Sequence, residues 1–516
     1  MIDRILGEHM ETTSSRKWRG TRALSMLAGI LTMGLTVTEV LADDTFTCKS
    51  VRAKQDSCTP LKLLPTLWPD VCNPQLNGWN PVQGSFDQLS WQSFSVLSWP
   101  VVPNKRGVPD KTKSPGDKDA SGKFLPMVWE SYKGLEEVFT GSKIPPGAWN
   151  SEEPVPSICP SGTGLRAVSM TSKTRSPHAV GGHAAPGPLR SVNQAVGGPL
   201  VDQNGNLVVY EIRINEVMFN DIVDKKAWNM SHDQLTCSGK YATKGCTPFE
   251  FSKGAIEAKA AWKMLTDAEK KSGKFFVRDL LVYIPADDNK GATSCQTQTM
   301  GLVGLHISRK TPFSTVASQS NSGSNKKPDW AWATFENDFN APPLGDSRTI
   351  GAYSFNNPAC TPSVTPDQCR KAVMTNSHGN VVPNPDTKYA CCQNMLRYGP
   401  VGPQGDPWVM KRGPIQLTRV DKSPQETEQC NGVWDRTLAK TIWDRYFLVT
   451  TQWPKKQDAP PFDAMPTPSH NRNTVIETYM TEWQQQANDT VQTNTSSCMG
   501  CHQFGIDMSF VFSAAK

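Results

Sequence analysis

The chain has 516 residues, a formal net charge of +6, and a hydrophobic fraction of 37%. This charge is modest, and no basic stripe with interleaved aromatic residues stands out, so the sequence argues against a nucleic-acid-binding protein. The length allows a large buried core and one to three domains, and the 38 Gly and 40 Pro residues predict many loops.

Residues 1–42 predict a secretory signal peptide. Four basic residues between Arg16 and Arg22 precede the uncharged apolar run Ala23–Val37, and small residues at Val40 and Ala42 fit a cleavage site. We therefore expect cleavage after Ala42 and a periplasmic or secreted protein, with an uncleaved anchor as the alternative. No later segment reaches the roughly 18 apolar residues of a membrane helix, so we expect no integral membrane segment after cleavage.

Fourteen cysteines occur in the chain, and two of them belong to a motif near the C-terminus. The other twelve form an even set, which an oxidising compartment favours as disulfides. Short spacing predicts the local pairs Cys237–Cys246 and Cys360–Cys369. The adjacent Cys391 and Cys392 are each expected to bond elsewhere.

The N-terminal region, residues 43–190, is expected to be irregular and helical with several cysteines. An apolar stripe over Phe86–Trp99 predicts a short helix that ends before Pro100. Lys105–Lys123 is charged and rich in turn-forming residues, which predicts an exposed loop. Helical spacing over Met127–Phe139 predicts an amphipathic helix, and residues 141–198 predict a long loop.

Residues 191–470 predict an α+β core that contains a Cys-rich excursion at 341–412. Asn204-Gly205 between two strand-like runs, 199–203 and 207–214, predicts a β-hairpin. The Ala- and Lys-rich segment Ala255–Leu265 predicts a helix. Further strands are expected at Lys274–Pro285, Met300–Arg309 and Trp330–Phe335, with possible additions at 413–420 and 443–453.

Residues 471–516 form the last predicted segment, with a helix expected at Thr474–Gln486 and a polar linker at 487–497. The fold class that follows is α+β. We expect a large, disulfide-stapled, loop-rich domain with an antiparallel β core and a short C-terminal segment that carries the motif described next.

The run Cys498-Met499-Gly500-Cys501-His502 is the most informative motif of the chain. Two cysteines three positions apart lie on one side of a helical turn and can add across the two vinyl groups of a haem. The adjacent histidine can then bind the iron. Cys498 and Cys501 are thus the predicted covalent anchors of one haem c, and His502 is its predicted axial iron ligand. A local disulfide or half of a zinc site are the alternatives.

Through this motif and the export signal the chain resembles the c-type cytochromes. The segments SWQSFSVLSWP, GGPLVDQNG, VGLHISRKT and WATFEN are similar to exported bacterial proteins of the cytochrome c family. That resemblance implies a shared fold and no particular reaction. The chain departs from the common arrangement, in which a methionine ligand follows the motif by dozens of residues, because only fourteen residues follow His502.

The sixth iron ligand must therefore come from elsewhere or be absent. Candidates are Met508, Met480 and His306, whose strand has glycines at 301 and 304 that would let a flat macrocycle approach. His470 and Met465 are further options. A methionine would raise the reduction potential, and an open position would permit ligand or peroxide chemistry. Phe504 and Met508 are also expected to pack beside the haem.

Electron transfer is the function that this reading favours, with single electrons exchanged with a periplasmic redox partner protein. One alternative is a haem-dependent oxidoreductase, dehydrogenase or peroxidase-like, that acts on a small substrate. Another is a haem-containing binding or sensor protein. We find no phosphate-binding loop, zincin helix or nucleophile elbow that would point to a catalytic residue.

Overall fold

The structure is a computed structural model. It describes residues 58, 63–67, 83–140, 144–152, 154–169, 200, 202–204, 206, 208–284, 294–311, 330–343, 353–356, 373–375, 381–383, 417, 419, 422–454, 466–468, 471, 473–476, 498–502 and 505–514. The expected signal peptide lies outside these residues. Within them, no helix is both long enough and apolar enough to cross a bilayer.

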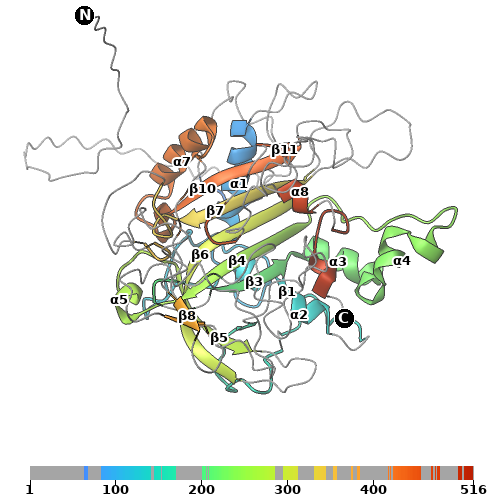
Figure 1. The fold of residues 1–516 in the computed structure, drawn as a ribbon, viewed down its shortest axis with the longest axis horizontal. Coiled ribbons are helices and arrows are strands. Elements are labelled where there is room, and N and C mark those ends of the chain that lie inside the picture. The colour runs from blue at the N-terminus through green and yellow to red at the C-terminus, as the bar shows by residue number, and fades with distance from the viewer. Residues whose placement is uncertain are drawn as a thin grey trace, which may run out of the picture. The chain divides into compact units, whose positions relative to one another are not determined.

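A central β-sheet organises the described part of the chain (Figure 1). Nine strands form it, in the order β1-β3-β4-β6-β7-β10-β11, with β5 paired to β6 and β2 paired to β5. All neighbours are antiparallel except β2 and β5. The strands are β1 Lys133–Gly134, β2 Ala167–Ser169, β3 Val209–Ile214, β4 Ile256–Met264, β5 Val277–Ile284, β6 Ser294–Lys310, β7 Trp330–Asn337, β10 Tyr446–Pro454 and β11 Pro466–Thr467. The predicted α+β class with an antiparallel core is confirmed.

The described residues also form helices and a small second sheet. The α-helices are α1 Gln83–Leu97, α2 Leu135–Val138, α3 Glu216–Asp224, α4 His232–Thr236, α5 Asp267–Lys270, α7 Gln425–Thr437 and α8 Cys498–His502. Short 3-10 turns are η2 Trp129–Ser131, η4 Ala227–Asn229, η5 Gly239–Tyr241, η7 Ile442–Arg445 and η9 Val511–Ala514. Strands β8 Val373–Thr375 and β9 Val381–Pro383 pair with each other in the region of the expected Cys-rich excursion.

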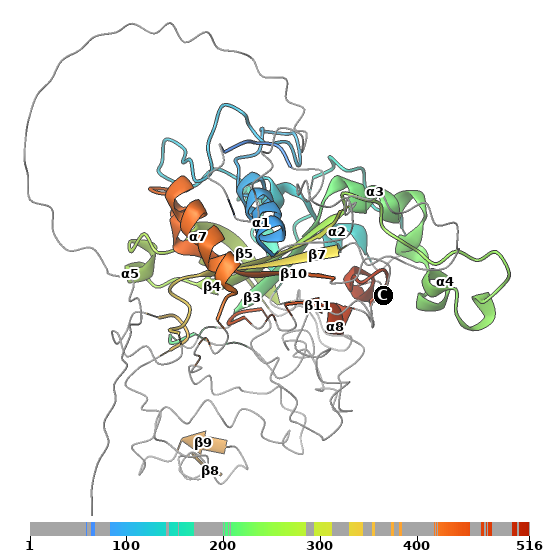
Figure 2. The same cartoon turned by 90° about the horizontal axis from the view of Figure 1, so that it is seen from above.

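Helices α1 and α7 cover one face of the sheet (Figure 2). The predicted helix at Phe86–Trp99 is confirmed as α1, and its Trp91 ring stacks on Trp434 of α7 at 5.6 Å. Trp91 also meets Phe335 of β7 edge-on at 4.9 Å. The sequence did not predict α7. Its apolar positions are few, so burial of Cys430, Val433 and Trp434 against α1 and the sheet decides its conformation.

The predicted helix at Ala255–Leu265 is wrong, because this segment is strand β4. It pairs with β3 on one side and β6 on the other, and Ala258 and Ala260 are fully buried between them. Alanine has a high helix propensity, but hydrogen bonding to strands on both sides outweighs a preference of a few tenths of a kcal/mol per residue. The small side chains also suit a crowded sheet centre.

The predicted helix at Met127–Phe139 is broken into three short elements, η2, β1 and α2. Arg106 donates hydrogen bonds to the carbonyls of Ser131 and Tyr132, and Arg213 donates to the Tyr132 carbonyl as well. The partly buried guanidinium group of Arg106 and the buried one of Arg213 take carbonyls that a helix would have used internally. Lys133 instead joins the sheet edge opposite Ile214.

Other expectations are met in part. The chain reverses at Asp202–Asn206, as predicted for the hairpin: Asp202 N donates to the Asn206 carbonyl and Val208 N to the Leu200 carbonyl, both at 2.9 Å. The Asp202 carboxylate also accepts from Asn204 N and Asn206 N. Strand β3 itself, which begins at Val209, pairs with β1 and β4. Strands β5, β6 and β7 match the three predicted ones. Asn473 accepts from the backbone of residues 475 and 476, as at a helix start, and the rest of the expected helix lies outside the described residues.

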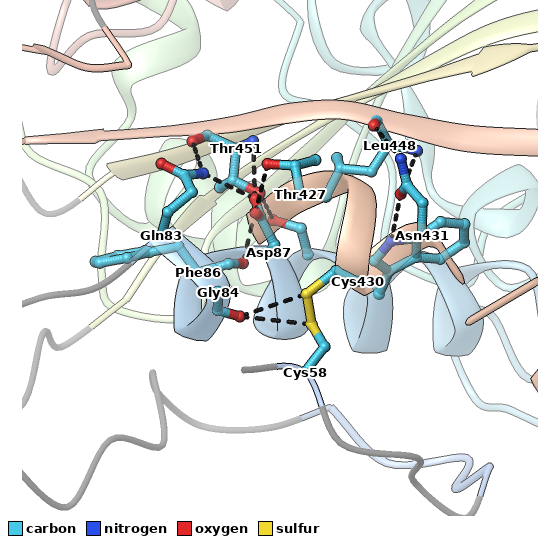
Figure 3. The surroundings of a disulfide bond; sticks show 12 residues. Cys58, Gln83, Gly84, Phe86, Asp87, Thr427, Cys430, Asn431, Leu448 and Thr451 are labelled. Atoms are coloured by element: carbon cyan, nitrogen blue, oxygen red, sulfur yellow. Dashed lines mark hydrogen bonds between the residues drawn. A yellow bond between two sulfur atoms is a disulfide. The ribbon is translucent and has the colours of Figure 1, made fainter. Parts of the chain in front are cut away.

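Three disulfides are described: Cys58–Cys430, Cys159–Cys295 and Cys237–Cys246. The last confirms a predicted local pair. The other predicted pair, Cys360–Cys369, and the adjacent Cys391 and Cys392 lie outside the described residues. Cys58–Cys430 spans 372 positions and ties the start of the described chain to α7, next to the first turn of α1 (Figure 3).

Beside this disulfide, Asp87 of α1 is a fully buried carboxylate (Figure 3). Its oxygens accept hydrogen bonds from Gln83 Nε2 (2.9 Å), Thr427 Oγ1 (2.6 Å) and Thr451 N (3.1 Å). All three donors are neutral. Burial therefore outweighs these bonds and raises the pKa of Asp87 from 3.8 to about 6.

We expect this pKa to make folding stability fall as pH rises from 4 to 6. The folded state holds the proton more tightly than the unfolded state, so the ionised form carries a penalty that is complete above pH 6 and absent below 4. Asp87→Asn should remove this slope, which amounts to about 2–3 kcal/mol. Urea unfolding of both proteins at pH 4 and 7 measures it. Parallel pH profiles for the two proteins would contradict the assignment.

Candidate haem-attachment site

The CxxCH motif forms the helical turn α8, which lies on the face of the sheet opposite α1 and α7 (Figure 2). Met499 N donates to Gln452 Oε1 of β10 at 2.9 Å, and Gln452 Nε2 in turn donates to the Pro468 carbonyl at 2.8 Å. Met499 is buried. One glutamine on the sheet thus anchors both α8 and the chain segment that follows β11.

Cys498 begins a row of polar contacts that crosses two strands. Asn471 Nδ2 donates to Cys498 Sγ at 3.3 Å and lies 3.4 Å from Thr334 Oγ1 of β7. Thr334 Oγ1 lies 3.1 Å from His306 Nε2 of β6, its direct neighbour in the sheet. The structure thus brings His306, a predicted site residue, to the same sheet face as the motif.

The imidazole of His502 is oriented by a hydrogen bond at Nδ1, the nitrogen that would not bind iron. His502 Nδ1 lies 2.7 Å from the Met508 carbonyl oxygen. A carbonyl only accepts, so Nδ1 carries the proton, and in the neutral ring the lone pair is on Nε2. Histidines that bind metals typically have this arrangement, with one nitrogen donating to a carbonyl and the other facing the metal. The rings of Trp332 and Phe510 lie 6.0 and 5.1 Å away.

The Met508 carbonyl belongs to a tight turn. Ile506 and Ser509 exchange two backbone hydrogen bonds of 3.0 Å, and the two residues between them have positive φ, 47° at Asp507 and 61° at Met508. This is the backbone of a type I′ turn, which costs about 1–2 kcal/mol for a residue such as methionine. Gly505 makes the turn possible, because a Cβ there would lie 2.5 Å from the Ser509 carbonyl.

Side chains on the sheet fix this turn in place. The Asp507 carboxylate accepts from Lys310 Nζ and from Phe251 N, both at 2.7 Å, and Ser509 Oγ donates to Glu257 at 2.8 Å. Burial raises the pKa of Asp507, and the Lys310 ammonium opposes that rise. The two anchors to β4 and β6 commit the C-terminal tail to one position.

The glycines around His306 do not have the role that the sequence suggested. A Cβ on Gly304 would collide with a methyl group of Val475, and one on Gly301 would lie 2.7 Å from Leu265. These glycines make room for side chains of this protein and not for a macrocycle. His306 Nε2 also lies 3.3 Å from the amide nitrogen of Asn473, which donates to it. His306 would have to give up these contacts to bind iron through Nε2.

The remaining predicted residues divide into two groups. Met508 is buried, and its backbone lies on the Nδ1 side of His502, away from Nε2, which favours a packing role over iron ligation. Cys501 lies within α8, but its side chain is outside the described part of the structure. The candidates outside the described residues are Phe504, Met480, Met465 and His470.

Two buried polar atoms next to the motif test whether a prosthetic group fits here. Trp332 Nε1 and Asn471 Oδ1 have no hydrogen-bond partner among the described residues. An unsatisfied buried polar atom costs free energy, so these two atoms are free to take a water or a bound group; the buried indole N–H groups of Trp434 and Trp443, away from the motif, are in the same situation. The indole N–H of Trp332 suits an acceptor such as a haem propionate. Among all residues that the structure describes, no three His, Cys, Asp or Glu side chains gather as a metal site made of protein ligands alone would require.

Sequence reasoning missed Asn471, Trp332, Thr334 and the Lys310–Asp507 pair. The alternation in Trp330–Phe335 does place Trp332 and Thr334 on one strand face, so that signal was present. Comparisons with models of protein families, with curated proteins and with solved structures found no match to this chain. The chemistry of the site therefore rests on its own residues.

Proposed function

We propose that this protein is an exported mono-haem c-type cytochrome that transfers single electrons. Cys498 and Cys501 would hold haem c through thioether bonds, and His502 would bind the iron. When bound, the haem supplies one-electron exchange between ferric and ferrous iron. The observation that carries the proposal is the contact of His502 Nδ1 with the Met508 carbonyl, which presents Nε2 as the ligand atom of a CxxCH turn.

Burial and compartment support the proposal. The rings of Trp332 and Phe510 flank His502, and apolar cover of this kind keeps water from an iron centre and tunes its potential. Three disulfides in the described residues fit an oxidising compartment. Such a compartment is the expected location of an exported haem c protein. The partner would be a periplasmic redox protein.

We expect the protein matured in a periplasm to contain one covalently bound haem. A pyridine haemochrome spectrum and the intact mass of the denatured protein measure it. Cys498→Ala/Cys501→Ala should abolish retention, because both thioether bonds are lost. The matched control is Cys237→Ala/Cys246→Ala, which removes another closely spaced pair and should keep the haem. Haem absent from the wild type, or retained in the first variant, would refute the proposal.

The optical spectrum of the same sample separates electron transfer from catalysis. A low-spin spectrum with a methionine–iron band in the red would support electron transfer. A high-spin ferric spectrum that shifts with cyanide or peroxide would instead favour a haem-dependent oxidoreductase. The His306→Ala variant tests whether His306 is the sixth iron ligand, because an unchanged spectrum would exclude it.

A further inference from the structure

A series of contacts in the C-terminal tail connects the sheet to His502. Its start is Lys310, the last residue of β6, whose side chain is 5% exposed. Its ammonium meets the Asp507 carboxylate at 2.7 Å, and that carboxylate is 12% exposed. A charge pair so far removed from water is costly to break, because the partner left behind stays buried.

Asp507 is linked to His502 through the next residue, Met508. It is the first central residue of the turn 506–509, and Met508 is the second. The carbonyl of Met508 is the acceptor for His502 Nδ1. Because Met508 disfavours a positive φ, the turn needs an external hold, which the bonds of Asp507 to Lys310 and Phe251 N provide.

We propose that Lys310 and Asp507 are positioning residues for His502. Through the turn they hold the Met508 carbonyl against Nδ1, and this fixes both the tautomer and the orientation of the imidazole. The consequence for iron rests on the proposed function, since a firmly held donor hydrogen bond increases the basicity of the ligand. The consequence for the tautomer does not depend on haem.

The test has a haem-free arm. In the full chain with Cys498→Ala/Cys501→Ala, the ring ¹⁵N shifts of His502 report which nitrogen carries the proton at a pH where the ring is neutral. We expect the Nδ1–H tautomer. Adding Lys310→Met or Asp507→Asn should lower the ratio of this tautomer to the other by about tenfold, the worth of one such hydrogen bond. Asp507→Asn is the milder change, because asparagine tolerates a positive φ and still accepts from Phe251 N.

The second arm uses the haem-loaded protein. Both substitutions should raise the reduction potential, because a less basic imidazole stabilises ferric iron less. Lys263→Met is the matched control. Lys263 is another fully buried lysine, paired with Asp202 at 3.2 Å and Glu269, and its loss should leave the tautomer and the potential unchanged. Circular dichroism confirms that each variant is folded.

The two arms separate the possible failures. If the wild type carries no haem, the proposed function fails, while the haem-free arm still decides the role of the pair. If haem is bound but Asp507→Asn and Lys310→Met leave both the tautomer and the potential at wild-type values, the positioning role is overturned and the proposed function stands. A shift of equal size in Lys263→Met would also overturn it, because the effect would then be general destabilisation.

Discussion

Replacing both Cys58 and Cys430 by serine should lower the free energy of unfolding by about 2–5 kcal/mol. The bond closes a loop of 372 positions, so its loss returns much conformational freedom to the unfolded chain. It also leaves two hydroxyl groups in a site where Cys58 is 7% exposed and Cys430 is fully buried. Denaturant unfolding at pH 7 under non-reducing conditions measures the loss.

The control for this experiment is the pair Cys237–Cys246, which closes a loop of only nine positions. Its removal should cost less, because a short loop restricts the unfolded chain less. Detachment of residue 58 should also loosen α7 from α1, so protection of α7 amides from hydrogen exchange should fall more than that of β6. Equal losses for both cysteine pairs would contradict the loop-length argument.

Glu211→Gln should destabilise the protein by about 3–5 kcal/mol, the usual cost of removing one partner of a buried ion pair. Glu211 of β3 is 5% exposed and accepts from Arg166 at 2.7 and 3.0 Å, from Arg213, and from Trp262 Nε1 at 3.1 Å. Glutamine keeps the shape but not the charge, and it turns an N–H group toward two arginines. Arg213 then stays buried with Glu137, 3.9 Å away, as its remaining carboxylate neighbour, and Arg166 keeps its ion pair with Glu130 at 3.1 Å.

The pH dependence gives this prediction a second test. The two arginines overcome the cost of burial and lower the pKa of Glu211 from 4.5 to about 2. The folded state therefore favours the ionised form, and the resulting stability is present above pH 4.5 and lost as the pH falls toward 2. The difference in the free energy of unfolding between the wild type and Glu211→Gln should therefore become smaller as the pH falls from 4.5 toward 2. Asp267→Asn, which changes a 90% exposed partner of Lys270, should alter stability little at any pH.

Local chemistry made part of this protein readable from its sequence. Short apolar or alternating runs predict the strands β5, β6 and β7, because a strand side chain meets the core at every second position. Cys237 and Cys246 are close enough in sequence to meet without any knowledge of the fold. The CxxCH motif is likewise complete within five residues, so its chemical hypothesis needed no tertiary structure.

Contacts between distant segments decided the rest. Neighbours on both sides turned Ala255–Leu265 into a strand, and arginines more than twenty residues away divided the segment at Met127–Phe139. At the candidate site, the sequence named His502 as a ligand, but what orients it became visible only in the fold. Lys310 stands 197 positions before Asp507, and only the packing of the tail on the sheet brings the two charges to 2.7 Å. No spacing rule encodes such a contact, because the burial that makes it strong arises only when the sheet is complete.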